Sequence, residues 1–327
     1  MLLCLEKDGR LRLVIDARRA NYHFQDQSHI ELATGDSLGR LELEEGESSH
    51  IPSSGLEDAF YHLGMPEEWR PYFGLRAIRA GAVGLAHLNG SLIHLETLLH
   101  PRLFVILIGW SWAVYWCQHA VQRVLATQPS CSVPHRIVDG QAPPNSKSSH
   151  FLYVDNLIII GSDQCSVQAA NEEGKAALRS AGLEVHQEEY AASDILVIGW
   201  EFDRPAIFRP ARKRVWRARL AIREILRISR ISGRLLEQLI GHLRFISQGR
   251  REILSVLGSV FGFIQAQYLK PVHLWKSVRR ELMLWDSMSP LIWTFPSPGA
   301  HQYMLLMPQS GALVFVLPSG LAQKCVR

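Results

Sequence analysis

Two apolar runs separated by a polar pair stand out near the middle of the chain. Residues 151–154 (FLYV) and 157–160 (LIII) flank Asp155 and Asn156. Short runs rich in aromatic and β-branched residues around an Asp-Asn pair predict a β-hairpin with a tight turn at that pair. Because both runs are apolar throughout rather than alternating, we expect both faces of the hairpin to be covered.

The polar pair places one carboxylate at the tip of this hairpin. A carboxylate is costly to bury without a partner, so Asp155 either faces solvent or is held by a cation. Asp and Asn also favour turns through their backbone geometry alone. The hairpin by itself therefore leaves both a structural and a functional interpretation open.

The remaining pattern predicts an α+β fold with a helical appendage. Strands are predicted at residues 11–15 (ending before Asp16), 41–43, 72–75, 103–109 and 195–200, and helices at 56–63, 112–125 and 166–181, the last ending at Gly182. From Pro210 the pattern is helical for about 80 residues, with breaks at Ser232-Gly233 and Pro271. Residues 25–54 and 127–149 have the polar, Gly-, Ser- or Pro-containing composition of loops.

Composition narrows the class of protein. A hydrophobic content of 47% with 20% charged residues in 327 residues indicates a globular chain of one to three domains. The five cysteines are an odd number without a CxxC spacing, which argues against a disulfide framework or structural zinc and for a reducing, intracellular compartment, cytoplasmic or nuclear. No signal peptide is predicted at the start. The longest apolar run, 103–117, is interrupted by Gly109 and Ser111 and indicates buried core rather than a membrane span.

Charge is distributed unevenly along the chain. Between Arg204 and Arg251 there are 14 Lys or Arg residues and only two acids, Glu224 and Glu237, a local balance of +12. The rest of the chain carries −8, since the total is +4. Such segregation favours a polyanionic partner, whereas a charge run can also be a solvated helix face. Here the acidic partners at i,i+4 are mostly missing, which favours nucleic acid as the partner over a solvated helix face.

Six separated stretches resemble, in order, the motifs of retroelement reverse transcriptases. They are RLVIDARRAN (a fingers motif), LEDAFYHLGMP (the first carboxylate motif), IGWSWAVYWCQ (the glycine motif), LYVDN (the second carboxylate motif, usually Tyr-x-Asp-Asp), GLEVHQEE with VIGWEFD, and LLEQLIGHLRFISQGRREILSVLGSVFGF (a helical thumb). The resemblance covers roughly residues 5–290. The run of six motifs in order, rather than any one of them, carries it.

The resemblance implies a right-hand polymerase fold. Its palm would be an antiparallel sheet with helices on one face, spanning 55–205 with a fingers insertion near 62–105. Residues 1–54 would form partial fingers, and 206–293 an all-helical basic thumb and connection. The short tail, 294–327, contains no Asp or Glu, so a ribonuclease H domain is excluded on chemical grounds.

The implied activity is template-directed DNA synthesis on an RNA or DNA template–primer, using dNTP substrates and Mg²⁺ or Mn²⁺. By resemblance Asp155 is a catalytic metal ligand. The family's first carboxylate stands five residues before Phe60, and that position here is Gly55. Asn156 stands where the second hairpin acid is usual. With one anionic ligand instead of three, we expect impaired polymerase activity. Leu107-Ile108 before Gly109 also depart from the family's usual pair.

Other site residues are also implied by the resemblance, each with a structural alternative. Arg12 and Lys7 would reach the triphosphate or simply flank a strand, and for Lys7 we favour the latter. Phe60 would gate the 2′-hydroxyl or pack in the core, and Gly109 would approach the nucleotide or open a helix. Tyr153 would contact the nucleotide. Nucleic acid would be bound by Arg212, Lys213, Arg214, Arg217, Arg244 and Arg250.

Three hypotheses remain at this point. The chain is a reverse transcriptase with impaired catalysis, or a non-catalytic nucleic-acid-binding protein of the same fold, or a globular α+β protein without a nucleic-acid role. The histidines show no metal-ligand spacing, and Trp110, Trp112 and Trp116 are assigned to packing, although Trp110 beside Gly109 could also stack on a base. The sequence does not assign an oligomeric state.

Overall fold

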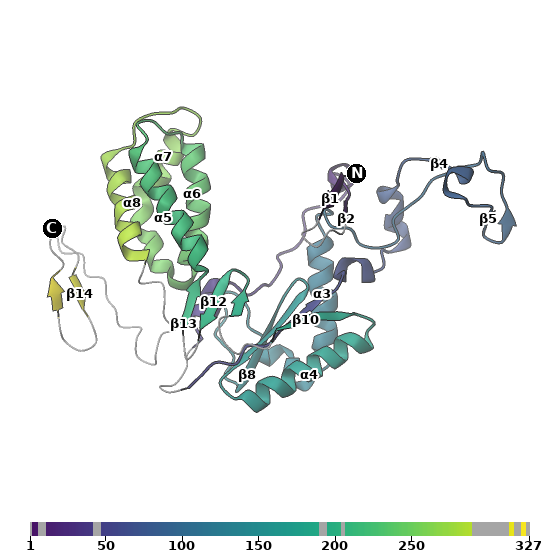
Figure 1. Cartoon of the computed structure of the whole chain (residues 1–327), viewed down its shortest axis with the longest axis horizontal. Coiled ribbons are helices and arrows are strands. Elements are labelled where there is room, and N and C mark those ends of the chain that lie inside the picture. Colours follow the sequence, from purple (N-terminus) through teal and green to yellow (C-terminus); the bar gives the residue numbers. More distant parts are fainter. Residues whose placement is uncertain are drawn as a thin grey trace.

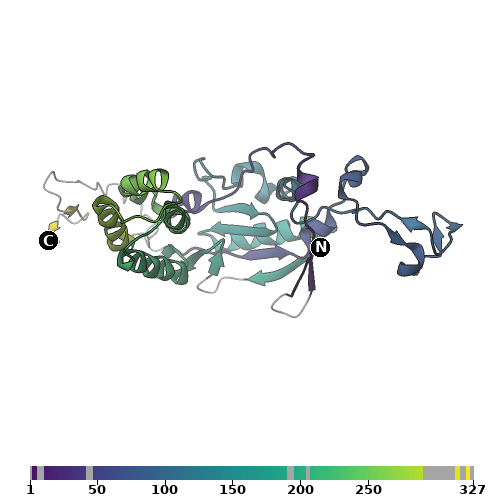
Figure 2. The same cartoon turned by 90° about the horizontal axis from the view of Figure 1, so that it is seen from above.

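A computed structural model describes residues 2–5, 11–41, 47–189, 195–203, 207–289, 314–316 and 322–324. The fold is α+β, with antiparallel sheets and helices. Figure 1 shows a central sheet with its helices in the middle, a helical bundle at one end, and an extended arm at the other. The view from above shows the arm pointing away from the bundle (Figure 2).

The central sheet has four strands in the order β10 (Val185–Glu189), β3 (Ser53–Leu56), β9 (Asn156–Gly161) and β8 (Ser148–Tyr153), and all neighbours are antiparallel. Helices α3 (Ala113–Leu125) and α4 (Gln164–Ser180) cover one face. Leu152, Leu157 and Ile159 point to that face and join the buried core that includes Val121 and Leu178.

The opposite face of the sheet is covered by a second, three-stranded sheet. Its strands are β11 (Ile195–Val197), β12 (Trp200–Asp203) and β13 (Ile207–Pro210), and the short helix α2 (Gly35–Gly39) packs beside them. Phe151, Ile158 and Ile160 join Trp200 and Phe208 in this core. Successive hairpin residues thus enter two different cores, because side chains alternate between the faces of a strand. The prediction that both faces are covered is confirmed.

The helical bundle is formed by α5 (Arg212–Arg227), α6 (Gly233–Ile246), the 3₁₀ segment η6 (Ser247–Leu257), α7 (Gly258–Ala266) and α8 (Lys276–Met288). Its core contains Leu236, Phe263 and Trp285, all fully buried. The long helical region is therefore confirmed. The sequence pattern missed the break at η6, where Arg250 has a non-helical φ of −150°.

Polar contacts join the bundle to the rest of the molecule at η6. Arg251 forms ion pairs with Asp36 at 3.2 Å and with Asp139 at 3.4 Å. The backbone N–H of Gly35 donates to the Gln248 side chain at 3.3 Å. These contacts tie the region of α2 and the turn that carries Asp139 to the bundle.

The N-terminal segment and the arm contain short elements. They are β1 (Leu2–Leu5), β2 (Leu11–Val14), α1 (Arg18–Asn21), η1 (Ala59–His62), η2 (Glu67–Phe73), β4 (Ile78–Arg79), η3 (Ala80–Val83), β5 (His87–Leu88), β6 (Ser91–Leu92) and β7 (Leu98–Leu99). Two further 3₁₀ turns, η4 (Pro129–Cys131) and η5 (Val133–His135), precede β8, and a hairpin of β14 (Val314–Val316) and β15 (Ala322–Lys324) lies in the tail.

Several predicted elements were wrong. Residues 103–109 form only isolated bridges, such as Val105 to Gly64, and not a strand. Residues 72–75 begin at the end of the 3₁₀ segment η2, and the predicted helix at 56–63 is a strand end followed by the 3₁₀ turn η1. The predicted strand at 195–200 is interrupted by a turn. Ile198 and Gly199 have positive φ, so β11 ends before them and β12 begins after them. Leu41 lies outside any strand, and 42–43 fall outside the described residues, as does most of 294–327.

The helices of the described residues are too short or too polar for a membrane span. Over the part of the chain that the structure describes, no helix combines the length and the apolar character needed to cross a bilayer. The apolar run 103–117 enters α3, where Ala113 and Cys117 are buried in the core, as predicted.

Candidate active site

The tip of the β8–β9 hairpin carries the predicted catalytic residues. Tyr153 pairs with Asn156, so the two turn residues are Val154 and Asp155 rather than Asp155 and Asn156. Val154 has a φ of +60°, in keeping with the turns that connect tight hairpins. The predicted turn was therefore one residue too late, and Asn156 is the first residue of β9.

Backbone pairing places four residues in a row across the open end of the sheet. Tyr153 on β8 pairs with Asn156 on β9, Asn156 with Gly55 on β3, and Gly55 with His186 on β10. Directly paired residues share one face of a sheet. The Leu56 N–H also donates to the Asp155 carbonyl at 2.8 Å. Gly55, Asn156 and Asp155 thus meet at one point, although Gly55 is about 100 residues away in sequence.

The chemical groups at this point are one carboxylate and one neutral amide. The Asn156 Nδ2 donates to the Asp155 Oδ1 at 2.8 Å. Gly55 contributes no side chain, and a Cβ built there would lie 3.4 Å from the Asn156 Oδ1 and 3.7 Å from the His186 Cε1. A Cβ at this position would make ordinary contacts, but the glycine offers no ligand.

Nearby acids do not replace the missing ligand. Asp58 is exposed and has a φ of +47° where the chain leaves β3. Among the residues that the structure describes, no group of three or more His, Cys, Asp or Glu side chains could hold a metal ion. Mg²⁺ prefers several anionic or carbonyl oxygens in octahedral geometry. The donor set at the hairpin tip does not fit a pair of such ions.

A buried glutamine that the sequence analysis missed holds the hairpin tip on α3. Gln118 is fully buried; its Nε2 donates to the Leu152 carbonyl at 2.9 Å, and its Oε1 accepts from the Val154 N–H at 2.8 Å. The Cys117 thiol also donates to the Val154 carbonyl, at 3.8 Å. The available signal was a polar residue on the core-facing side of an apolar helix.

The Cys117 thiol stays protonated beneath the turn. Burial raises its pKa to about 12, and the negative charge of Asp155 adds to the rise. A thiolate is the reactive form of cysteine. Cys117 therefore acts as a packing residue and a weak donor at this position.

Replacing Gln118 by alanine should lower the free energy of unfolding by about 2 kcal/mol, because Val154 N–H and Leu152 C=O would lose their buried partner. Urea denaturation measures this change. Arg123→Ala, on the exposed side of the same helix, should leave stability nearly unchanged. Equal stabilities of the Gln118 variant and the natural protein would show that the two hydrogen bonds do not hold the tip.

The predicted nucleotide-binding residues lie in different settings. Tyr153 is 38% exposed and belongs to the row at the sheet's open end. Phe60 is partly buried and packs against two cores, that of α3 with α4 and that around Trp110. Arg12 lies on β2, but its side chain falls outside the described residues, as does Lys7 altogether.

Gly109 occupies a position that requires glycine. Its φ is +109°, and a Cβ there would lie 3.1 Å from the Ile15 carbonyl. Asn21 fixes this turn, because its Nδ2 donates to the Gly109 carbonyl at 3.1 Å and its Oδ1 accepts from the Ser111 N–H at 3.0 Å. Helix α1 is therefore fastened to the turn that leads into α3.

The basic residues in and next to the bundle are less free than their number suggests. Arg209 and Arg212 both contact Glu201, at 2.9 and 3.6 Å. Arg214 lies over the Phe245 ring with its Cζ 3.9 Å from the centroid. The acidic partners come from other elements, which is why local spacing did not reveal them.

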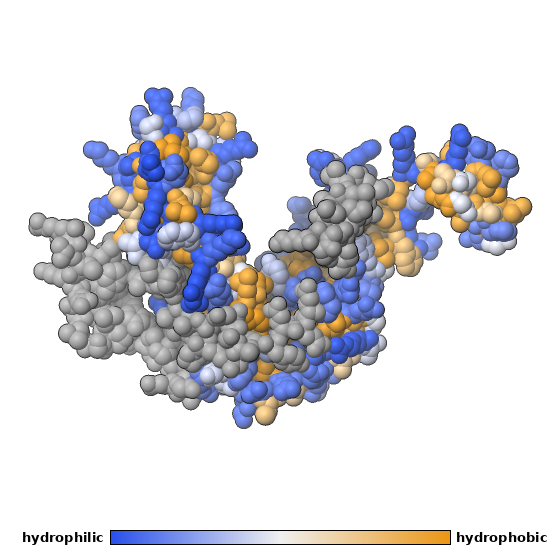
Figure 3. Space-filling model, viewed as in Figure 1, coloured by the Kyte–Doolittle hydropathy of each residue, from blue (hydrophilic) through white to orange (hydrophobic). Residues whose placement is uncertain are grey.

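Four of the predicted nucleic-acid-binding residues are exposed, namely Arg212, Lys213, Arg217 and Arg244, and of these Arg212 contacts Glu201. Arg250 is half-buried at the kink in η6. Figure 3 shows hydrophilic side chains along the bundle and a wide hollow between the bundle and the arm. Exposed Trp216 on α5 has the Arg223 guanidinium 5.9 Å from its ring centroid.

Comparison with known proteins gives a structural match only. No family model matches the sequence, and no curated protein matches it. A solved structure of a foamy viral protease-reverse transcriptase in complex with double-stranded DNA is similar, with a TM-score of 0.58 and 14% identity over 98% of this chain. The match covers 49% of that protein, so this chain spans about half its length. The chain has the fold of a reverse transcriptase.

Proposed function

We propose that this chain is a reverse transcriptase domain of retroelement type whose polymerase activity is impaired and which retains binding of an RNA or DNA template–primer. The observation that supports the proposal is the row at the hairpin tip, where Gly55 and Asn156 lie beside Asp155. These are the positions at which the resemblance implies carboxylates. A single acid therefore remains where three would gather.

The parts of the fold can be assigned on this basis. The central sheet with α3 and α4 corresponds to a palm (55–205), the bundle to a thumb and connection (206–293), and the N-terminal segment with the arm to fingers (1–54 and the insertion near 62–105). The tail, 294–327, has no ribonuclease H chemistry. The hollow between bundle and arm would hold the nucleic acid.

The proposed loss of activity has a direct physical cause. Phosphoryl transfer to a primer needs two divalent ions that clamp the attacking and leaving oxygens. The ligands for Mg²⁺ or Mn²⁺ would be the Asp155 carboxylate and the neutral Asn156 oxygen, because Gly55 on β3 supplies no bridging carboxylate. A site with so little anionic charge does not repay the dehydration of two dications. A dNTP would be a substrate only for a site in which the missing carboxylates are present.

A non-catalytic nucleic-acid-binding role is the second candidate, and the incomplete donor set favours it. Primer extension with Mg²⁺ or Mn²⁺ separates the two. Extension by the natural protein that is lost in Asp155→Ala would establish a working enzyme, whereas binding without extension would establish the non-catalytic role. A globular protein without any nucleic-acid role would show no salt-dependent binding at all.

Removing the exposed basic residues of the bundle should weaken binding to a template–primer duplex. A triple Lys213→Ala, Arg217→Ala, Arg244→Ala variant should flatten the slope of log K against log salt by about 2 to 3, because each phosphate contact contributes roughly 0.9. Fluorescence anisotropy of a labelled duplex at several salt concentrations measures this.

The control removes charge from α8, which Figure 1 shows on the side of the bundle away from the hollow. Lys276 and Arg280 are exposed on this helix. Their double alanine variant should bind the duplex nearly as well as the natural protein. If this variant loses as much affinity per charge removed as the triple variant does, binding is a property of net charge and the bundle has no specific nucleic-acid face.

A further inference from the structure

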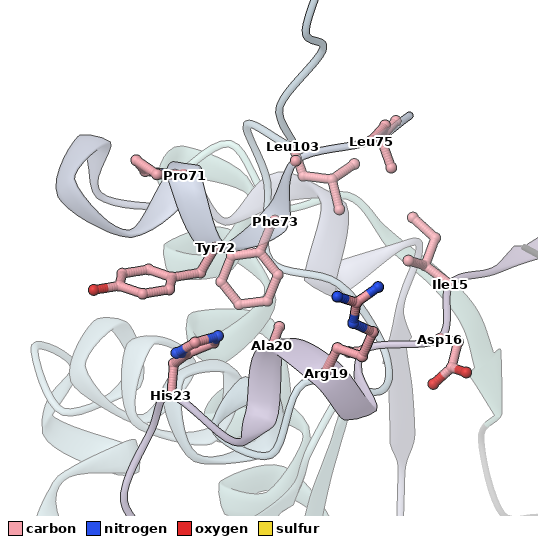
Figure 4. Close-up of a pocket in the computed structure, with 12 residues that line it drawn as sticks. Ile15, Asp16, Arg19, Ala20, His23, Pro71, Tyr72, Phe73, Leu75 and Leu103 are labelled. Atoms are coloured by element: carbon pink, nitrogen blue, oxygen red, sulfur yellow. The ribbon is translucent and has the colours of Figure 1, made fainter. Parts of the chain in front are cut away.

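A polar cavity lies away from the hairpin tip, between the N-terminal segment and η2. The volume is about 410 Å³, one wall is formed by 71–75 with Leu103, and the other by Ile15, Asp16, Ala17, Arg19, Ala20 and His23. Figure 4 shows the Arg19 guanidinium and the His23 ring opposite Tyr72 and Phe73. Small-molecule sites are commonly concave, mostly apolar and fitted with a few polar groups, at volumes of about 300–1,000 Å³.

Among the described residues, Arg19 is a cation of this cavity without an ion-pair partner. Of the described residues that line the cavity the only acid is Asp16, and it is bound to Arg18 through the Arg18 Nε at 2.9 Å and Nη2 at 2.6 Å. This pairing holds the pKa of Asp16 well below its usual range, so its charge is matched at neutral pH. Arg19 is exposed and, within the described residues, forms no ion pair. Its guanidinium is suited to a phosphate, which it can bind through two parallel hydrogen bonds.

The side chains of Arg19 and His23 lie on the same side of the helical turn because they are four residues apart. The turn of α1 continues beyond its last residue, since the His23 N–H donates to the Ala20 carbonyl at 2.9 Å. Side chains at i and i+4 lie on the same helix face. Both residues therefore face the cavity, as Figure 4 shows.

The opposite wall offers an aromatic surface with firm support. Tyr72 is 48% exposed, and the centroid of its ring lies 5.2 Å from that of His23. Behind it, Phe24 contacts Tyr72 edge-on at 5.4 Å and stacks on Phe73 at 5.7 Å. Buried Trp110 closes the same cluster, 5.2 Å from Phe24. A half-exposed ring held by packed rings is a stacking surface for a planar ligand.

We infer that this cavity binds one nucleotide of a single-stranded nucleic acid, with its phosphate on Arg19 and its base against Tyr72 and His23. The inference rests on the proposed nucleic-acid-binding function and adds a second contact region to it. A single strand is required because a base in a duplex is already stacked and paired, whereas an unpaired base can reach an aromatic side chain. A phosphate alone would use Arg19 but not the aromatic wall.

Hydrogen bonds also connect the cavity to the end of the sheet that carries Asp155. Asn21, on the same short helix as Arg19, holds the Gly109–Ser111 turn through two hydrogen bonds. That turn leads into α3, on which Gln118 holds the hairpin tip. A strand bound at Arg19 would therefore be held by elements that also position Asp155.

The test compares a labelled single-stranded oligodeoxythymidine with a blunt duplex of the same length by fluorescence anisotropy. Arg19→Ala and Tyr72→Ala should each weaken single-strand binding roughly tenfold, with duplex binding unchanged, because one phosphate contact or one stacked base is lost. Tyr72→Phe should retain most of the affinity, since the ring remains. Tyr22→Ala, which removes an 89% exposed ring outside the lining, should bind both probes as the natural protein does.

Other outcomes overturn the inference in distinguishable ways. If the Arg19 and Tyr72 variants bind the single strand normally while the Lys213–Arg217–Arg244 variant loses the duplex, the proposed function stands and this cavity is not its second contact region. If thymidine monophosphate displaces the oligonucleotide at an equal concentration of nucleotide units, the ligand is a free nucleotide rather than a strand. If the natural protein binds neither probe, the proposed function itself is wrong.

Discussion

A Gly55→Asp, Asn156→Asp double variant should extend a primer at least about 100-fold faster than the natural protein in the presence of Mg²⁺. The two substitutions would place carboxylates on adjacent, directly paired strands beside Asp155. Three acids at one point would supply the charge that two dications need, and metal ions contribute several kcal/mol of transition-state stabilisation. Single-turnover extension of a labelled primer measures the rate.

The backbone at position 55 leaves room for a Cβ. The nearest neighbours of a Cβ there are the Asn156 Oδ1 at 3.4 Å and the His186 carbonyl at 3.6 Å, which are ordinary contact distances. By contrast, a Cβ at Gly161 would meet the Lys147 carbonyl. Gly161→Ala is therefore a control for misfolding and not for catalysis.

Two comparisons make the rescue interpretable. Adding Asp155→Ala to the double variant should abolish the gained activity, because the hairpin carboxylate would be lost. Gly55→Asn with Asn156 retained should give little gain, since it fills the same space without charge. A double variant that folds and binds the duplex but does not extend the primer would mean that catalysis fails for another reason than the missing carboxylates.

The second large effect concerns the stability of the central sheet in acid. His150 on β8 is 3% exposed, and burial lowers its pKa to about 4, with the nearby charges of Arg136 and His135 adding to the decrease. An unfolded histidine has a pKa of 6.5, so the unfolded state binds the proton more readily between pH 6.5 and 4. Stability is fully present above pH 6.5 and should fall by about 3 kcal/mol as the pH decreases to 4.

Urea denaturation at pH 7 and pH 4.5 tests this effect in a His150→Leu variant. The natural protein should lose more stability than the variant over this interval, because only the natural protein must protonate the buried imidazole on unfolding. His62→Gln, at an exposed position, should retain the pH dependence of the natural protein. Identical pH dependence in all three proteins would assign the acid sensitivity to carboxylate pairs such as Arg136–Glu31 instead.

The predictable part of the site lay in local pattern. The aromatic and β-branched runs at 151–154 and 157–160 predicted the hairpin, and the absence of a carboxylate at Gly55 is visible in the sequence itself. The turn was misplaced by one residue because the register depends on which backbone groups are held, and Gln118 holds Leu152 and Val154 from a different element. No local window contains that contact.

The basic surface, too, depends on contacts between distant segments. The excess of arginine between Arg204 and Arg251 correctly marked a basic helical region. The sequence did not show that Arg219 is paired with Asp286 at 2.6 Å or that Arg251 reaches Asp36 and Asp139. These acids lie on other elements, so the free basic surface is smaller than the count implies.

The sequence alone determined the helical periodicity of the bundle, the apolar hairpin and the lack of carboxylates beside Asp155. These are properties of neighbouring residues and of residue type. The tertiary structure decided that Tyr153, Asn156, Gly55 and His186 form one row, and that Arg19 faces Tyr72 across a cavity. Those arrangements arise from strand pairing and core packing between distant segments, which are set by how complementary surfaces fit together rather than by local preference.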